Sequence, residues 1–140
     1  MEELLFIETI RVEDGIFVRP EFHLQRMRQT VREAYGAAFN FDLADGSIPL
    51  QHRKGTEKCR IVYGRSLSEI SFAPYVPREI RSLRLVAADD ELDYHLKYAD
   101  RSALARLLQR RDDCDEILIV RDGAITDTSY SNVAFFDGRK

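Results

Sequence analysis

Several features that would assign a function class are scarce in this sequence. Its 140 residues contain no tryptophan and only two cysteines, Cys59 and Cys114, which have no CxxC spacing and lie within apolar or helical stretches. We therefore expect buried, reduced thiols rather than a disulfide or a metal pair. No apolar run approaches the roughly 20 residues of a membrane-spanning helix, and the first three residues are acidic where a secretory signal is basic. A cytoplasmic protein without a membrane partner is expected.

An excess of basic charge is also missing. Lysine and arginine number 21 against 24 aspartates and glutamates, with both signs mixed along the chain. Nucleic-acid backbones require a basic patch or stripe, so nucleic acid is excluded as an expected partner. The length allows one ordinary domain or two very small ones, and the apolar share is that of a globular protein with a real core.

The first third of the sequence predicts a hairpin followed by a helix. Residues 4–12 are rich in β-formers, and Asp14-Gly15 supplies a tight turn before residues 16–18. Pro20 suits the first turn of a helix, in which apolar residues recur at three- and four-residue steps until Gly36 ends it. This helix is expected to lie on the sheet of the hairpin.

Further strands are predicted on both sides of a boundary. A poorly periodic stretch with a short helical turn at residues 45–52 precedes two strands, at 59–63 and 69–75. The prolines and charges that follow indicate a linker, and an apolar strand at 83–87 opens a second unit. The sequence thus predicts a small N-terminal α+β domain, residues 1–78, and a second domain that starts at residue 79 and runs to residue 140.

The second domain is predicted to alternate helix and strand. Residues 101–111 form a helix with leucines on one face, and residues 116–120 form a strand. Asp122-Gly123 turns the chain back into 124–128, and 132–136 makes another strand.

Two groups of polar residues are candidates for chemistry. Residues 95–101 place Lys97 just before the predicted helix, although an isolated lysine is ordinarily solvated. Thirty residues further on (127 − 97), the predicted strand 124–128 is followed by Ser129-Tyr130-Ser131-Asn132, which stands directly before an apolar run. Such a cluster belongs in a loop or a site.

Together with these two groups, other short motifs occur along nearly the whole chain, seven in all. They are Ile7-Glu8-Thr9-Ile10-Arg11, Asp14-Gly15, His23-Leu24-Gln25-Arg26, Leu96-Lys97, Asp100-Arg101, Asp122-Gly123-Ala124-Ile125-Thr126-Asp127 and Ser131-Asn132. In order and spacing they resemble the class IV aminotransferases, which have pyridoxal 5′-phosphate (PLP) fold type IV. The family includes branched-chain and D-amino-acid aminotransferases and 4-amino-4-deoxychorismate lyase. The resemblance implies an α+β fold with a small N-terminal domain and the first part of a larger C-terminal domain, PLP as cofactor, and a homodimer.

The resemblance also implies roles for two basic residues. Lys97 matches the lysine that forms a Schiff base with PLP and then moves protons, for which its amine must be neutral. Neighbouring cations such as Arg26 and Arg101 would favour the neutral form. Arg26 matches the phosphate-binding arginine, whose forked donors suit a phosphate dianion. His23, one helical turn away, is expected to be structural or to orient Arg26.

Two further residues complete the predicted cofactor site. Asp127 falls where the family usually has a glutamate that pairs with the pyridine nitrogen, and its shorter stem needs the ring about one carbon–carbon bond closer. The alternative is an aspartate that turns or caps the chain. Asn132 matches a family asparagine and is expected to support the loop around the cofactor.

The resemblance leaves three functions open. Ser102 stands where branched-chain enzymes have a tyrosine, five positions after the lysine, and this favours 4-amino-4-deoxychorismate lyase, which releases pyruvate and yields 4-aminobenzoate for folate synthesis. The first alternative is a class IV aminotransferase acting on a branched-chain or D-amino acid. The second is a non-catalytic remnant or a dimerising α+β module, since the family's second domain continues beyond the length seen here. For the enzymes, the expected partner is a small substrate carrying an amino group.

Overall fold

The computed structural model describes residues 3–88 and 97–139. The described segments are divided between two compact units, one containing residues 3–77 with Lys97 to Ala99, the other residues 78–88 with 100–139. The predicted domain division at residue 78 stays a prediction. In chain order the elements are β1 (Phe6–Glu13), β2 (Ile16–Phe17), α1 (Pro20–Tyr35), η1 (Asp45–Ser47), η2 (Leu50–His52), β3 (Thr56–Tyr63), β4 (Leu67–Pro74), β5 (Leu83–Ala87), α2 (Ser102–Leu108), η3 (Gln109–Arg111), β6 (Glu116–Arg121) and β7 (Ala124–Asp127).

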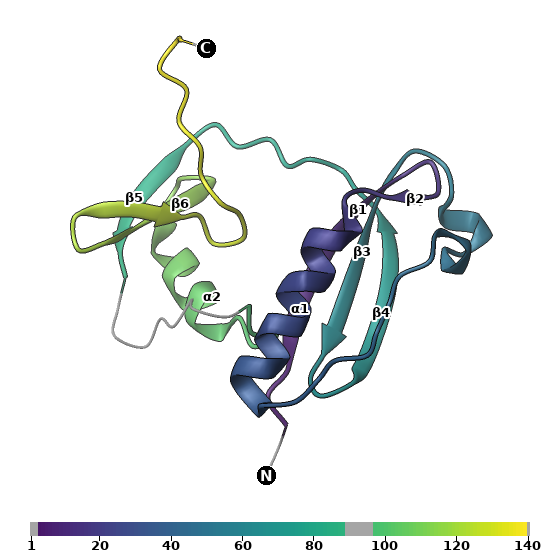
Figure 1. The fold of residues 1–140 in the computed structure, drawn as a ribbon. Helices are drawn as coiled ribbons and strands as arrows, with labels where there is room; N and C mark the ends of the chain where they lie inside the picture. Colours follow the sequence, from purple (N-terminus) through teal and green to yellow (C-terminus); the bar gives the residue numbers. More distant parts are fainter. Residues whose placement is uncertain (1–2, 89–96, 140) are drawn as a thin grey trace. The chain divides into compact units, whose positions relative to one another are not determined.

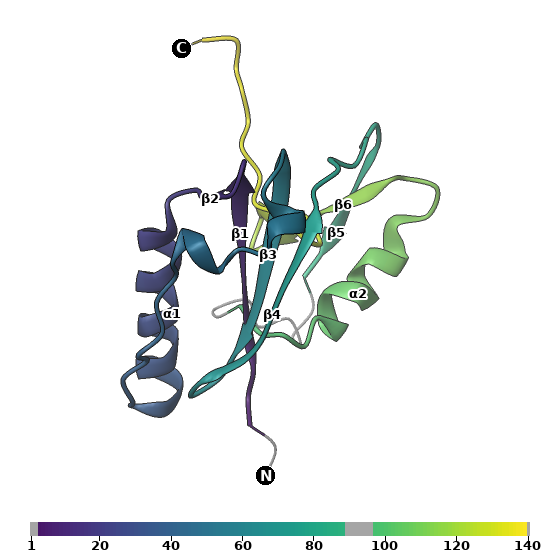
Figure 2. The same ribbon diagram turned by 90° about the vertical axis from the view of Figure 1, so that its right-hand side faces the viewer.

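The first unit is an antiparallel sheet in the order β2-β1-β3-β4, with α1 lying along one face (Figures 1 and 2). The turn between β1 and β2 has positive φ angles at Asp14 and Gly15, as the sequence predicts. Gly36 ends α1 at φ 62°, where its N–H bonds the carbonyl of Arg32. A left-handed residue at this position closes the last turn and favours glycine.

Alternation along β1 decides which residues enter the core. Side chains of successive strand residues point to opposite faces, so Phe6, Glu8, Ile10 and Val12 share the face that α1 covers. All four are 0% exposed. Three are apolar, as a core requires, and Glu8 places a carboxylate among them.

The segment Lys97 to Ala99 continues the sheet at the free edge of β1. The Ile7 N–H donates to the Lys97 carbonyl (2.7 Å), and the Ala99 N–H donates to the Leu5 carbonyl (2.8 Å). Phe6 and Tyr98 lie opposite each other, with ring centroids 5.3 Å apart. The segment therefore belongs to the first unit, although it follows the first strand of the second unit in sequence.

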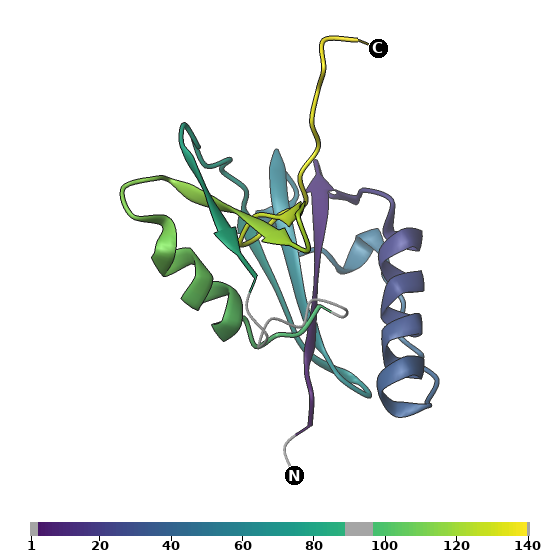
Figure 3. The same ribbon diagram turned by 90° about the vertical axis from the view of Figure 1, so that its left-hand side faces the viewer.

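The second unit is a three-stranded sheet in the order β5-β6-β7, in which β5 and β6 are parallel and β7 is antiparallel. Helix α2 lies beside β5 and β6 (Figure 3) and buries Leu104 and Leu107. A crossover that contains a helix is the usual connection between parallel strands. Of the helix predicted over 101–111, only Ser102–Leu108 is α-helical, and the 3-10 helix η3 follows from Gln109.

Two sequence predictions fail. The strand expected at 132–136 does not form, because the described residues give it a backbone partner only at Asn132, which bridges to Asp127. Phe135 and Phe136 are 74% and 82% exposed. Both cysteines are free, but Cys114 is only half-buried, whereas Cys59 is buried as expected.

No helix in residues 3–88 and 97–139 is long and apolar enough to cross a membrane. The predicted motif residues His95 and Leu96 lie outside the described residues.

Candidate functional site

A buried carboxylate organises the first half of the predicted site. Glu8 is fully buried beneath α1, and two side chains one helical turn apart on that helix reach it. His23 Nδ1 lies 2.6 Å from Glu8 Oε1, and Arg26 Nε donates to both carboxylate oxygens at 3.1 Å. Arg26 Nη2 also donates to Oε1. Residues three apart on a helix share a face, so α1 presents this pair to the carboxylate as a unit.

Lys97 lies beside the same carboxylate. Its carbonyl accepts from Ile7, the residue before Glu8, so the backbone of Lys97 is fixed against β1. The Lys97 side chain is half-buried, and its charge acts on Glu8. The structure thus brings Arg26 and Lys97 into one unit, around one anion.

The charge state of Glu8 results from opposing effects. Burial alone would raise the pKa of this carboxyl. The hydrogen bonds from His23 and Arg26 and the charges of Arg26 and Lys97 outweigh burial, and the pKa of Glu8 lies below its usual value. Glu8 is therefore an anion at neutral pH and balances part of the positive charge around it.

The second half of the predicted site is a small hairpin after β7. Asp127 and Asn132 form an antiparallel bridge, and the four residues between them make the turn. The Thr128 N–H donates to the Ser131 carbonyl (2.9 Å), and the Thr128 hydroxyl accepts from the Ser131 N–H (3.0 Å). The two hydroxyls are 2.7 Å apart. Asp127 and Asn132 are thereby held opposite each other at the base of a tight turn.

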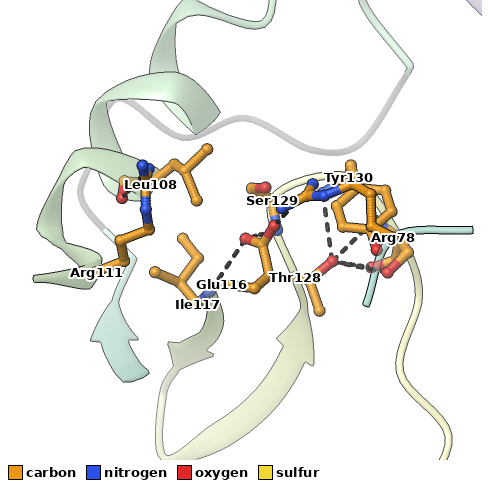
Figure 4. A network of polar contacts seen from close by, with 9 residues as sticks. Arg78, Leu108, Arg111, Glu116, Ile117, Thr128, Ser129 and Tyr130 are labelled. Carbon is orange, nitrogen blue, oxygen red and sulfur yellow. Dashed lines mark hydrogen bonds and ion pairs between the residues drawn. The ribbon is translucent and has the colours of Figure 1, made fainter. Parts of the chain in front are cut away.

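Glu116 and Arg78 both contact this turn (Figure 4). Glu116, at the start of β6, is fully buried, and its Oε1 accepts from the Ser129 N–H at 3.3 Å. Arg78 Nη1 is 3.4 Å from Glu116 Oε2, and the Arg78 guanidinium lies 4.7 Å from the centroid of the Tyr130 ring. An arginine over an aromatic face is an attractive cation–π pair. Two consecutive residues of the turn are therefore contacted from β6 and from Arg78.

Desolvation changes the acidity of Asp127. Partial burial raises the pKa of this carboxyl above its ordinary value. A carboxylate whose ionised form is penalised in this way gains most from a cationic partner. A positively charged partner, such as a protonated ring nitrogen, would therefore stabilise the ionised form of Asp127.

Residues on both units fit the chemistry of PLP. Lys97 supplies an amine, and Asp127 supplies a carboxylate whose ionised form a cation would stabilise. Arg26 is half-exposed, at 49% of its side chain, and binds Glu8 through Nε and Nη2. A guanidinium suits the charge and geometry of a phosphate. Among the described residues, no group of three metal-ligating side chains forms a metal site.

Sequence reasoning missed the roles of two fully buried glutamates, Glu8 and Glu116. Glutamate is almost never fully buried unless it is paired, so neither Glu8 nor Glu116 stands out by residue type. Glu8 has a signal in retrospect, since it occupies a core-facing position of a strand that otherwise alternates. Its partners His23 and Arg26 were singled out, and the expectation that His23 orients Arg26 takes a specific form in the shared contact with Glu8.

A pocket on the first unit is lined by none of the four predicted residues. Its walls include Thr9, Arg11, Lys58 and Tyr75. Arg11 and Lys58 are register partners on β1 and β3, and both are exposed. Arg11 also binds Glu13, so part of its charge is balanced.

The fold agrees with a family match over almost the whole chain. The model of the class IV aminotransferases matches residues 5–140. The chain belongs to this family, whose members are PLP-dependent enzymes with fold type IV. The resemblance inferred from the short motifs is thus confirmed, as is the mixed helix-and-sheet fold.

Particular relatives share most of the chain. An uncharacterized protein of Haemophilus influenzae is 36% identical over 138 residues, covering 95% of this chain and 72% of the relative. The crystal structure of a candidate 4-amino-4-deoxychorismate lyase of Haemophilus somnus is similar at 31% identity and a TM-score of 0.73, over 92% of this chain and 69% of that one.

More distant structures share the fold. A candidate amino-acid aminotransferase of Mesorhizobium loti is 21% identical, with a TM-score of 0.63, over 91% of this chain and 67% of that one. A hypothetical aminotransferase of Mycobacterium tuberculosis in its PLP-bound form is 18% identical, with a TM-score of 0.60, over 89% of this chain and 55% of that one.

Proposed function

We propose that this chain carries the Schiff-base lysine of a 4-amino-4-deoxychorismate lyase, which releases pyruvate and leaves 4-aminobenzoate for folate synthesis. The observation that carries the proposal is the attachment of Lys97 to β1 beside Glu8, the anion that also binds Arg26. The 31% identity to a structure described as a candidate lyase of this kind supports the choice of substrate.

In this proposal each residue has a distinct task. PLP, when bound, supplies an electron sink for the carbanion formed at the substrate's Cα. The neutral amine of Lys97 removes the proton from Cα and holds it. Arg26 balances the charge of the phosphate, and Asp127 keeps a proton on the ring nitrogen. Asn132 supports Asp127 from the other side of the hairpin.

The negative charge of Glu8 bears on how an anion could bind beside Arg26. A phosphate dianion placed beside Arg26 would be repelled by a bare carboxylate. Glu8 is instead covered by His23 and Arg26, so its charge is largely compensated before any ligand arrives. The carboxylate also holds the Arg26 side chain in one orientation, which lowers the entropy lost when an anion binds.

Labelling of Lys97 tests the proposal directly. PLP is added to the protein, the visible absorption band is recorded, and borohydride then fixes the cofactor to its lysine for peptide mapping. We expect the label on Lys97 and no band in Lys97→Ala. Lys58→Ala removes an exposed lysine of the same unit and should leave the band unchanged. Label on another lysine, or no band in the wild type, would refute the assignment.

Product analysis then separates the lyase from the aminotransferase. Aminodeoxychorismate should yield pyruvate and 4-aminobenzoate, whereas pairs of amino and keto acids should not exchange their amino group. Amino exchange without pyruvate release would favour the aminotransferase. We also propose a cytoplasmic homodimer, for which light scattering at micromolar concentration should give twice the mass of the chain.

A further inference from the structure

We propose that Glu116 and Arg78 are positioning residues that hold the Asp127–Asn132 hairpin in place for the cofactor ring. The inference rests on the proposed function, in which Asp127 faces the ring nitrogen. Neither residue belongs to the motifs that carry the family resemblance. Both are assigned here from their contacts alone.

The burial of Glu116 calls for an explanation. A fully buried carboxylate is costly unless it is paired and hydrogen-bonded. Oε1 accepts from the N–H of Ile117 (3.0 Å) and from that of Ser129 (3.3 Å). In the described part of the chain Oε2 has no hydrogen bond, and Arg78 Nη1 approaches it only at ion-pair distance, 3.4 Å. Arg78 therefore lies where it balances the charge of Glu116, and Glu116 Oε1 binds the backbone of the turn at Ser129.

The position of these contacts links them to Asp127. Ser129, whose N–H Glu116 binds, is two residues after Asp127, and Tyr130, which Arg78 covers, is two residues before Asn132. The turn is fixed internally by Thr128 and Ser131, as Figure 4 shows in part. Internal bonds fix the shape of the hairpin, whereas Glu116 and Arg78 fix its place against β6. A displacement of one ångström at a catalytic group can cost a hundredfold in rate, so the placement matters for Asp127.

Glu116→Gln is the first variant, because it keeps the size of the side chain and removes the charge. The amide can still accept from Ser129, but more weakly, and its NH₂ faces the donors of Arg78. Arg78→Met removes both the ion pair and the cation–π contact from a half-exposed side chain, and unlike Glu116→Gln it alters no fully buried residue. Arg78→Lys keeps the positive charge, so its effect should be smaller than that of Arg78→Met.

Glu57→Gln is the matched control. Glu57 is also a buried carboxylate with one oxygen lacking a hydrogen bond among the described residues, and it binds His52 in the first unit. Glu57→Gln thus makes the same change at a buried carboxylate that lies far along the chain from the hairpin. A general loss of stability would therefore appear in both glutamine variants.

Two readouts are needed. Hydrogen exchange of the peptide spanning 127–132 reports the hairpin without any cofactor, and we expect exchange about tenfold faster, equal to about 1.4 kcal/mol, in Glu116→Gln and Arg78→Met. PLP affinity should fall about tenfold and the pH titration of the bound band should shift, because the ring nitrogen loses a well-placed partner. Glu57→Gln should change neither readout.

The outcomes separate the two proposals. Unchanged exchange in Glu116→Gln and Arg78→Met would overturn the inference, as would faster exchange with unchanged PLP affinity and band. Equal changes in Glu57→Gln would reduce the effect to general destabilisation and overturn it as well. A wild type that takes up no PLP would refute the proposed function, and exchange would then still decide whether Glu116 and Arg78 hold the hairpin.

Discussion

Replacing Glu8 by glutamine removes the negative charge beneath α1 while keeping the shape of the side chain. His23 and Arg26 would then face an amide that competes as a donor. Removing one partner of a buried ion pair typically costs about 3–5 kcal/mol. Half of the Arg26 side chain is exposed and keeps its water, so we expect the lower end of this range, about 3 kcal/mol.

The assay is urea unfolding at pH 7, followed by far-UV circular dichroism. Glu69→Gln, on β4 of the same sheet and exposed, is the control and should change stability by less than about 0.5 kcal/mol. The reasoning is refuted if Glu8→Gln and Glu69→Gln lose the same stability.

The pH dependence of the Glu8 effect has a definite sign. The pKa of Glu8 is lowered in the folded protein, so its stabilisation is complete above the ordinary glutamate value of 4.5. It is lost as the pH falls through the lower folded-state value. The stabilities of the wild type and Glu8→Gln should therefore differ at pH 7 and converge in acid. A constant difference down to low pH would show that the loss comes from packing instead of charge.

Three further predictions concern the fold. Burial raises the pKa of the Cys59 thiol to about 11, so a thiol reagent at pH 7.5 should modify half-buried Cys114 and leave Cys59 untouched until the protein is unfolded, as peptide mapping would reveal. Gly36→Ala should cost about 1 kcal/mol in urea unfolding because of its positive φ, whereas Gly46→Ala, without that angle and with open space around it, should be nearly neutral. Leu107→Ala, on the buried face of α2, should cost about 2–5 kcal/mol, and a loss below 1 kcal/mol would contradict the packing.

Local patterns predicted most of the secondary structure. Turn residues at Asp14-Gly15, the start at Pro20 and the stop at Gly36 act within a few residues of themselves, and the hairpin and α1 form where they indicate. The strand at 83–87 follows equally from its apolar run. In the strand predicted over 132–136, residues 133–136 are apolar as well. A strand exists only with a partner, however, and composition does not reveal whether one is present.

The candidate site was less accessible to sequence reasoning. Lys97, Arg26, Asp127 and Asn132 came from motifs, and their proposed roles stay predictions. What the motifs lacked was the pairing between distant segments. That Lys97 lies against Ile7 depends on a backbone hydrogen bond between distant segments, and that Ser129 lies against Glu116 depends on a bond from its N–H to the glutamate side chain.

The attachment of Lys97 to Ala99 along β1 has a consequence for dissecting this protein. A fragment ending at Pro77 would include all of β1, β3 and β4, yet it would leave the backbone of Leu5 and Ile7 without the partners they have here. Phe6 would also lose the ring of Tyr98. Exposed strand edges promote pairing with other chains, so such a fragment should aggregate. Truncations and protease cuts should therefore spare the connection to Ala99, even though sequence order suggests the linker after Pro77 as the natural place to divide the chain.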